Sequence, residues 1–448
     1  MRNPIHVLKS LEEKASVSNY KYERLYRNLY NPEFYLLAYA NIAKSQGSMT
    51  QGVDGQTLDN MSLPRINRII ESIRNRTYQP KPAKRKYIPK KNGKLRPLGI
   101  TSTDDKLVQE VVRMILEAIY EPTFSNNSHG FRPKRSCHTA LTQVKKNFTG
   151  VTWIVEGDIK ACFDNFDPHV LVELLRKRIS DEAFIGLIWK FLKAGYMEQW
   201  QYHMTYSGTP QGSGMSPILA NIYLNELDRY MGEYKARFYK PTRTANPAHR
   251  NMASKIFYYK AKNDKVWDDL SVEEKKECAR TLRQMRSEQR KLPTHPVQET
   301  SYKAIQYVRY ADDFIVGVIG SHEDAKKLKQ DLTVFLKEKL GLTLSTEKTK
   351  ITNTAENARF LGYDISVSRS QDIKRLKNGK RQRVYSGVVQ LRMPLEKWTA
   401  KLLEYGAIRI KKDESGKPCQ EENSLTGRIL RYSVATIRRY EDCTITTQ

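Results

Sequence analysis

Two adjacent carboxylates interrupt the stretch VRYADDFIVGV, and this arrangement constrains the fold more than any other feature of the chain. Val308 and Tyr310 precede Asp312 and Asp313, and an apolar run that begins at Phe314 follows them. Apolar, β-branched and aromatic residues on both flanks predict two short buried strands. Burial of an unpaired charge is costly, so the carboxylates need a cation, hydrogen-bond donors or water. A plain hairpin turn is the alternative, because aspartate is a common turn residue.

A second acidic stretch, TWIVEGDIKACFDNFD, lies far upstream in the sequence. An apolar strand over residues 151–155 leads, through Glu156, into Gly157 and Asp158. If the two acidic strands are neighbours in one sheet, Asp158, Asp312 and Asp313 converge on a small volume, where like charges raise each other's pKa. A pair of Mg²⁺ ions relieves this repulsion, since hard cations prefer oxygen ligands. Two such ions also clamp the attacking and leaving oxygens of an in-line phosphoryl displacement.

The charge balance indicates a polyanionic partner. The 448 residues include 77 lysines and arginines against 49 aspartates and glutamates, a formal net charge of +28. Self-repulsion of this size destabilises a compact chain unless a polyanion lies against it, which favours nucleic acid over an anionic membrane. No apolar run approaches the ~20 residues of a spanning helix, so we expect no membrane association.

Cysteine and histidine usage argues against a disulfide framework or a zinc site. The five cysteines are scattered without a CxxC pair, and the histidines form no HExxH motif. This pattern suits a reducing compartment. We therefore expect a cytoplasmic protein, with an organellar matrix as the alternative, and the excess of positive charge favours association with the nucleoid or with ribonucleoprotein.

Basic residues are concentrated in three blocks, at 65–96, 232–306 and 369–383. A single run of charged residues usually forms a solvated face. Three basic blocks with interleaved tyrosines instead favour a groove that follows a phosphate backbone and stacks bases. The block at 232–306 is polar, helical by pattern and flanked by apolar segments, so we interpret it as an insertion. Its candidate RNA-binding residues are Arg280, Arg283 and Arg286.

Two turns are candidate nucleotide-binding elements. In YIPKKNGKLRPLGI, an asparagine–glycine pair with alternating apolar residues on both sides predicts a hairpin. Lys90 on one arm and Arg96 on the other present two cations, which suit a triphosphate. The turn GTPQG, rich in glycine and proline, precedes a predicted helix and brings Gln211 within range of a nucleotide.

Six stretches in order resemble the consecutive motifs of reverse transcriptases, specifically the group II intron-encoded kind. They are GFRPKRSCHTAL, GDIKACFDNFD, TPQGSGMSPILANIYL, RYADDF, LTLSTEKTKI and FLGYDI. The resemblance implies an α+β right-hand polymerase fold with an antiparallel palm sheet. Residues 1–150 would form an N-terminal extension and fingers, 151–364 a palm with interleaved fingers elements, and 365–448 a partial helical thumb or maturase (X) region.

The resemblance also implies roles for individual residues. Those that would hold two Mg²⁺ ions, with Mn²⁺ as a substitute, are Asp158, Ile159, Asp312 and Asp313, and the three aspartates would be catalytic. Those that would bind the incoming nucleotide are Lys90, Arg96, Phe163, Gln211 and Lys348. Those that would grip the primer end are Phe360, Leu361 and Gly362.

Some of these residues have plainer alternatives. Phe163 would exclude a 2′-hydroxyl by its bulk, and Lys348 would lie near the leaving pyrophosphate. An ordinary core aromatic and a surface lysine are the respective alternatives. Ala161 stands where the family more often has glycine, which is a small departure on the same turn.

The implied function is that of an RNA-directed DNA polymerase of a group II intron. It would add dNTPs to a DNA primer on an RNA template by two-Mg²⁺ phosphoryl transfer, and would bind intron RNA as a maturase. A domesticated bacterial reverse transcriptase of the retron or defence type is one alternative, and a non-catalytic RNA-binding splicing factor is another. The long insertion favours the intron type, and the presence of all three carboxylates disfavours a non-catalytic protein. After LRMPLEKWTAKLLEYGAI the resemblance fades, which leaves splicing and target cleavage open.

Overall fold

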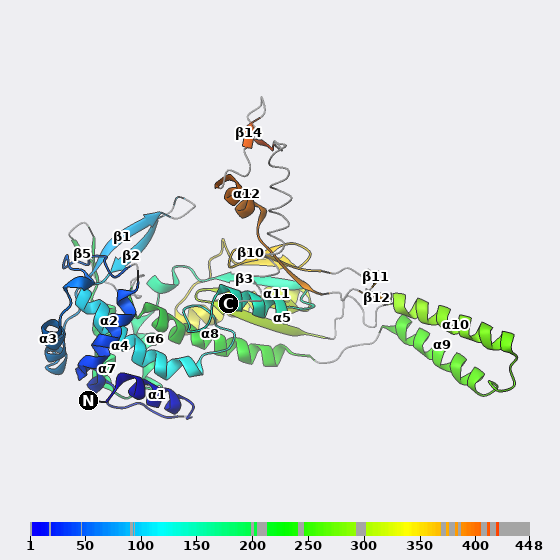
Figure 1. Cartoon of the computed structure of the whole chain (residues 1–448), viewed down its shortest axis with the longest axis horizontal. Helices are drawn as coiled ribbons and strands as arrows, with labels where there is room; N and C mark the ends of the chain where they lie inside the picture. Colours follow the sequence, from blue (N-terminus) through cyan, green and yellow to red (C-terminus); the bar gives the residue numbers. More distant parts are fainter. Residues whose placement is uncertain are drawn as a thin grey trace.

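A computed structural model of the chain shows a body of packed helices and sheets from which a helical hairpin extends (Figure 1). The residues that the structure describes are 2–17, 19–45, 47–89, 93, 95–198, 201–203, 213–240, 246–292, 302–368, 373–375, 381–383, 387–404, 410–412 and 418–420. Lys90 and Gln211, two of the expected nucleotide-binding residues, lie outside this set.

The central sheet has four antiparallel strands in the order β6-β7-β3-β8. Its strands are β3 (Trp153–Asp158), β6 (Ala304–Tyr310), β7 (Asp313–Ile319) and β8 (Lys350–Asn353). Apolar runs form these strands because β-branched and aromatic side chains fit a pleated surface that is buried on both faces. The two acidic stretches of the sequence therefore end in strands that are hydrogen-bonded neighbours, β3 and β7.

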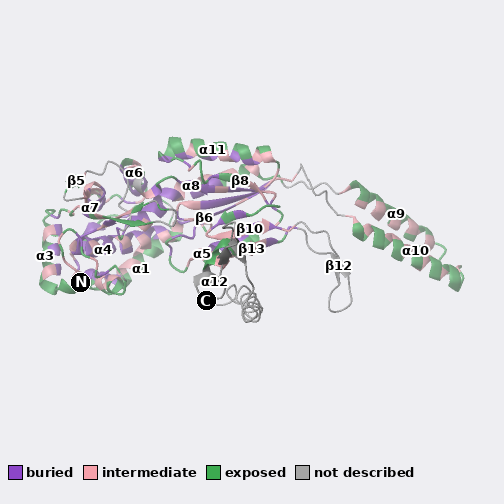
Figure 2. Cartoon of the chain, turned by 90° about the horizontal axis from the view of Figure 1, so that it is seen from above, coloured by how far each residue is buried: buried purple, intermediate pink, exposed green. Residues whose placement is uncertain are grey.

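Alternate side chains of this sheet enter two separate cores. Val155 and Val316 belong to the larger core, and Ile154 and Ile315 belong to the smaller one on the opposite face. The period of two residues along a strand produces this division. Three helices that flank this sheet contribute to these cores: α8 (Ser216–Phe238) and α11 (His322–Leu340) to the larger core, and α5 (Cys137–Asn147) to the smaller one. Figure 2 shows the buried interior of this region in purple.

The N-terminal region packs helices beside a second sheet, with strand order β2-β1-β4-β5. Its helices are α1 (Pro4–Ala15), η1 (Tyr26–Tyr30), α2 (Pro32–Ala43), η2 (Leu58–Asn60), α3 (Leu63–Arg74), α4 (Thr103–Tyr120), η3 (Glu121–Thr123), α6 (Pro168–Arg176) and α7 (Glu182–Lys193). Its strands are β1 (Ala83–Pro89), β2 (Leu95–Ile100), β4 (Tyr196–Glu198) and β5 (Gln201–His203). Helix α4, capped by the Ser102 side chain, contacts α1, α2 and α8 and joins this region to the central sheet.

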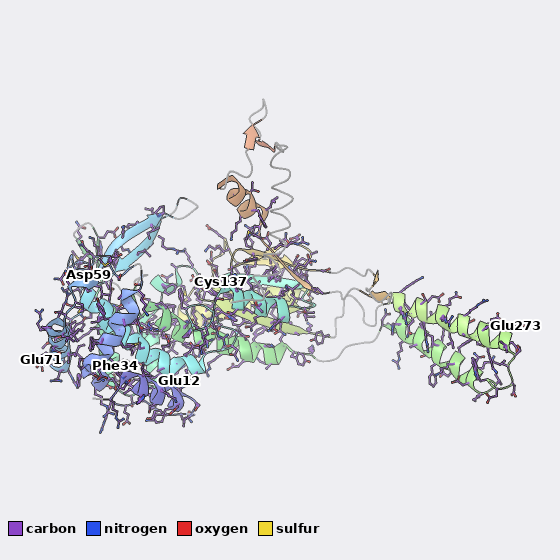
Figure 3. The ribbon with its side chains drawn as sticks, viewed as in Figure 1. Glu12, Phe34, Asp59, Glu71, Cys137 and Glu273 are labelled. Atoms are coloured by element: carbon purple, nitrogen blue, oxygen red, sulfur yellow. The ribbon has the colours of Figure 1, made fainter. Side chains whose placement is uncertain are left out.

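The insertion is a helical hairpin of α9 (Pro247–Asp264) and α10 (Val272–Lys291). Neither helix contains a buried residue, so neither contributes to a buried core shared with the body. The two helices pack against each other and side chains project along their length, with Glu273 near the outer end of the hairpin (Figure 3). This exposure agrees with the polar composition that marks the segment as an insertion.

The C-terminal region begins with a small sheet in the order β13-β10-β9, which covers the second core. The remaining elements are β9 (Ala358–Phe360), β10 (Tyr363–Val367), β11 (Ile373–Arg375), β12 (Arg381–Arg383), β13 (Val389–Arg392), α12 (Leu395–Glu404), β14 (Ile410–Lys412) and β15 (Pro418–Gln420). Helix α12 starts within the stretch predicted to begin a thumb. Among the helices in the described part of the chain, none combines the length and apolar character that a bilayer crossing requires.

Candidate active site

The two acidic strands bring carboxylates together at one end of the central sheet. Asp158, the last residue of β3, is the cross-strand partner of Asp313, the first residue of β7. Asp313 is also opposite Tyr310 of β6, so Ala311 and Asp312 form the turn between β6 and β7. Directly opposed residues of antiparallel strands have side chains within contact range. The convergence of Asp158 and Asp313 therefore follows from strand pairing.

This proximity is electrostatically unfavourable without a cation. Burial, followed by the negative charges of Asp312 and Asp158, raises the pKa of Asp313 to about 7. Burial also raises the pKa of Asp312 above its usual range, and the Asp158 charge adds to this effect. The donor set consists of carboxylate oxygens, which are the ligands that Mg²⁺ prefers. The residues thus fit a divalent cation chemically, although no three His, Cys, Asp or Glu side chains in the described part of the chain form a ready-made metal cluster.

Lys348 supplies a positive charge to this group. Its Nζ donates hydrogen bonds to both carboxylate oxygens of Asp158. The lysine precedes β8, which pairs with β3 on the side opposite β7. The site therefore combines three carboxylates with one ammonium group from three neighbouring parts of the sheet.

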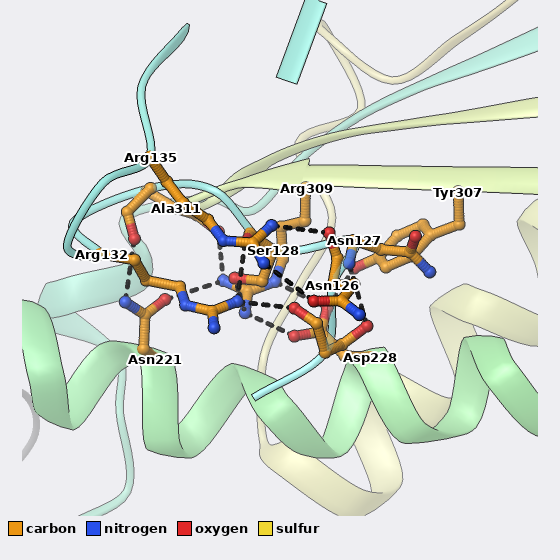
Figure 4. A network of polar contacts seen from close by, with 12 residues as sticks. Asn126, Asn127, Ser128, Arg132, Arg135, Asn221, Asp228, Tyr307, Arg309 and Ala311 are labelled. Carbon is orange, nitrogen blue, oxygen red and sulfur yellow. Dashed lines mark hydrogen bonds and ion pairs between the residues drawn. The ribbon is translucent and has the colours of Figure 1, made fainter. Parts of the chain in front are cut away.

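A buried ion pair lies next to Ala311, the residue that precedes Asp312 in the turn (Figure 4). Arg309 of β6 and Asp228 of α8 are both fully buried at the side chain, and two hydrogen bonds of 2.8 and 2.6 Å join them. Tyr307 donates a further hydrogen bond of 2.9 Å to Asp228. Charge-assisted, bidentate pairs of this kind are geometrically specific. Sequence reasoning missed this pair, although an arginine inside an apolar strand was a signal that it needed a buried partner.

The Arg309 guanidinium also holds the turn itself. It donates a hydrogen bond of 2.9 Å to the carbonyl of Ala311, whose φ of 56° is in the left-handed region. Further bonds reach Asn221 at 3.3 Å and Ser128 at 2.8 Å. All the guanidinium nitrogens are engaged, so the carbonyl next to Asp312 is tied to α8 and to the segment around Ser128. That segment runs so close that a Cβ on Gly130 would collide with the backbone of Ala311.

Phe163 lies in η4 (Cys162–Asp164), the first helical turn after β3. Its ring is half-buried and meets Phe166 edge-on at 5.9 Å and Phe131 edge-on at 6.2 Å between centroids. Phe131 is 52% exposed, and sequence reasoning did not single it out. Ala161, at the start of η4, has a φ of 46°, a conformation in which glycine would avoid Cβ strain.

The other expected residues lie on several different elements of the chain. Arg96 is exposed on β2, opposite Ile88 of β1. Burial raises the pKa of Asp312, and the positive charge of Arg96 opposes this rise. Leu361 and Gly362 form the turn between β9 and β10, with φ values of 49° and 80°, and Phe360 before them is buried. The expected RNA-binding residues Arg280, Arg283 and Arg286 are all exposed on α10, on the hairpin that extends from the body.

Comparisons with known proteins identify related chains. A family model described as "Reverse transcriptase (RNA-dependent DNA polymerase)" matches residues 88–240 and 278–365. "Group II intron-encoded protein LtrA" of Lactococcus lactis subsp. cremoris is 46% identical over 397 residues, which cover 88% of this chain and 65% of that protein. "Protein YkfC" of Escherichia coli (strain K12) is 34% identical over 367 residues, or 80% of this chain and 86% of that protein.

Other matches cover a smaller share of the related protein. "Uncharacterized 91 kDa protein in cob intron" of Schizosaccharomyces pombe is 40% identical over 426 residues, 92% of this chain and 50% of that protein. The chain thus spans 65% and 50% of the lengths of the LtrA and cob-intron relatives. Among solved structures, telomerase from Candida Tropicalis with a fragment of telomeric RNA aligns with a TM-score of 0.38 and 16% identity, over 64% of this chain and 44% of that one.

Proposed function

The chain belongs to the reverse transcriptase family, and we propose that it acts as the RNA-directed DNA polymerase of a group II intron. The reaction joins the 3′-hydroxyl of a DNA primer to the α-phosphorus of a dNTP and releases pyrophosphate, with RNA as the template. The observation that carries this proposal is the cross-strand pairing of Asp158 with Asp313, beside the turn that holds Asp312. Such a group of carboxylates suits phosphoryl transfer, in which catalysis consists mainly of positioning and charge stabilisation.

We assign the divalent-metal site to the side chains of Asp158, Asp312 and Asp313 together with the backbone of Ile159. Two Mg²⁺ ions bound there, or Mn²⁺ in their place, would activate the primer hydroxyl and stabilise the charge on the leaving pyrophosphate. The protein's own contribution is to hold the three carboxylates together at one end of the central sheet. The bond from Arg309 to the Ala311 carbonyl supports this role, because it restrains the turn next to Asp312.

Residues around the carboxylates suit binding of the incoming nucleotide. Arg96 and Lys348 are exposed cations whose charges both act on Asp312, and they would neutralise the triphosphate. Lys90 and Gln211 are also proposed to bind the nucleotide, on the basis of the sequence motifs alone. The half-buried Phe163 ring, held edge-on by two other phenylalanines, would lie under the sugar and exclude a 2′-hydroxyl. Phe360, Leu361 and Gly362 would hold the primer end.

The intron-specific role rests on similarity and on the insertion. LtrA is named as a group II intron-encoded protein, and we extend intron RNA binding and a maturase role to this chain by that similarity. The exposed arginines of α10, namely Arg280, Arg283 and Arg286, would contact phosphates of the RNA. The site of action would be cytoplasmic ribonucleoprotein, with an organellar matrix as the alternative.

Primer extension by the full chain tests the proposal. With an RNA template, a DNA primer, dNTPs and Mg²⁺, we expect extension that EDTA abolishes. Asp312→Asn should abolish extension and leave RNA affinity nearly unchanged, because the carboxylate serves the chemistry. RNA binding without extension by the unmodified chain would favour a non-catalytic splicing factor. Extension with no preference for structured intron RNA over other RNA would favour a domesticated bacterial enzyme.

A further inference from the structure

A cavity of about 290 Å³ lies at the base of the helical insertion, where α8 ends and α11 begins. We call it the basal pocket and define it by two aromatic and four cationic residues. They are Tyr234, Arg237, Phe238, Lys240, Lys303 and Lys327.

The basal pocket is separate from the active site. Lys240 and Lys303, where the chain leaves for the insertion and returns from it, are joined by two backbone hydrogen bonds of 2.9 and 3.2 Å. Strand β6 begins directly after Lys303 and runs for seven residues before the turn that holds Asp312. At ~3.3 Å per residue, the strand separates the pocket from the carboxylates by about 20 Å.

Positive charge in the basal pocket exceeds the negative charge available to neutralise it. Two carboxylates line it, and each already has a partner. Asp324 accepts a hydrogen bond of 2.6 Å from Lys303. Asp331 accepts one of 2.9 Å from the Tyr234 hydroxyl. Within the described ranges, Lys240 and Lys327 have no carboxylate within ion-pair distance, so an anion entering the pocket would meet uncompensated charge.

Aromatic rings lie among these cations. Tyr234 and Phe238, one turn apart on α8, are stacked with an interplanar angle of 23° and 6.2 Å between centroids. The Arg237 guanidinium lies 5.7 Å from the Tyr234 ring centroid, and Lys303 Nζ lies 5.9 Å from that of Phe238. Both rings are only partly buried. Ring faces beside cations are the combination that binds single-stranded nucleic acid, since bases stack while cations contact phosphates.

We propose that the basal pocket binds a nucleotide of single-stranded RNA outside the template path, with phosphate near Lys240 and Lys327 and a base near Phe238. The assignment rests on the proposed function only in taking RNA as the natural polyanion. An acidic polypeptide would use the cations but would have no base to stack on the rings. The basal pocket would thus be a second RNA-binding site of the polymerase, located at the base of the insertion.

A charge-reversal experiment tests the phosphate contacts. The full chain, preloaded with saturating unlabelled template–primer duplex, is titrated with a fluorescent single-stranded oligouridylate across a range of salt concentrations. Lys240→Glu/Lys327→Glu should weaken binding by at least about fivefold and lower the salt slope by about 1.4, which corresponds to two phosphate contacts at ~0.7 each. The matched control is Lys337→Glu/Lys339→Glu, which makes the same charge change on exposed residues of the last turn of α11. Equal losses in both variants, or no loss in the basal variant, would overturn the proposal.

A second variant tests the base contact. Phe238→Leu should weaken oligouridylate binding by about fivefold or more, the lower end of base–aromatic stacking, and should leave inorganic polyphosphate binding unchanged. A change in both would show that the ring is structural, and competition by polyglutamate equal to that by RNA would overturn the assignment of RNA. Primer extension at saturating template should be normal in these variants. A wild-type chain that fails to extend primers would contradict the proposed function, whatever the outcome at the basal pocket.

Discussion

Lys348 Nζ lies 2.9 Å from Oδ1 and 3.0 Å from Oδ2 of Asp158. The lysine side chain is 66% exposed and the aspartate side chain is 14% exposed, so a solvent-facing cation neutralises a largely buried carboxylate. This hydrogen bond raises the pKa of Lys348 and keeps the ammonium charged. In the proposed reaction, the same ammonium would lie next to the carboxylates that hold the metal ions and would face the developing charge on pyrophosphate.

Replacement of Lys348 tests whether this cation acts in the chemistry. Lys348→Met should lower kcat for primer extension by about 10²-fold, the typical effect of removing one group that stabilises transition-state charge. Lys348→Arg should retain much of the activity because the charge remains. Steady-state extension at saturating template measures both. Unchanged kcat in Lys348→Met would show that the ion pair is only structural.

The buried pair of Arg309 and Asp228 should affect stability and activity in separable ways. Arg309→Met alone leaves a buried carboxylate without a partner and should lower the free energy of unfolding by about 3–5 kcal/mol. The double variant Arg309→Met/Asp228→Leu removes both charges, so it should be more stable than Arg309→Met alone, and the lost buried hydrogen bonds should keep it below the original chain. It nevertheless loses the bond to the Ala311 carbonyl, and displacement of Asp312 should lower kcat by up to about 10²-fold.

Chemical denaturation and primer extension on the same preparations make this comparison. Asn221→Ala is a milder companion variant, because it removes one acceptor of Arg309 and leaves the ion pair intact. A stable double variant with the kcat of the original chain would show that Arg309 contributes to folding alone.

Phe163 should determine the preference for deoxynucleotides. Phe163→Val opens space beside the sugar, so the variant should extend a primer with ribonucleotides that the original chain rejects. Phe166→Leu is the matched control, because Phe166 is a fully buried neighbour whose ring meets Phe163 at 5.9 Å. The control should lose stability without a change in sugar preference. If Phe163→Val still rejects ribonucleotides, the ring is an ordinary core aromatic.

Replacement of Arg96 and replacement of Arg283 should have different effects on activity and RNA binding, although both are exposed arginines. Arg96→Ala should raise the KM for dNTP or lower kcat while RNA affinity stays nearly constant, because its charge lies close enough to act on Asp312. Arg283→Ala, on the helical hairpin, should weaken RNA binding and reduce the salt slope by about 0.7–0.9, with little effect on extension at saturating template. Filter binding across salt, paired with steady-state kinetics, separates the two. Identical profiles would mean that both are general basic surface.

Local sequence patterns predicted the approximate position of the carboxylates, and the resemblance to reverse transcriptases predicted the fold class. Apolar runs ending at Asp158 and flanking Asp312 predicted two strands, and the structure forms β3, β6 and β7 there. The polar segment between them predicted an insertion of helices, and α9 and α10 occupy it. The motif order predicted an α+β polymerase with an antiparallel palm, and this prediction is confirmed by the family match and by the sheet. These features are readable because strand and helix periodicity are properties of neighbouring residues.

Only the tertiary structure decided which distant side chains meet. Lys348 was expected near pyrophosphate, but its pairing with Asp158, 190 residues away, depends on β8 lying beside β3. The partner of Arg309 is 81 residues away on α8, and no spacing rule connects them. The basal pocket likewise forms only where the end of α8 meets the start of α11. Such contacts depend on how whole helices and strands pack against each other. The sequence pattern shows that a buried charge needs a partner, but it does not identify that partner.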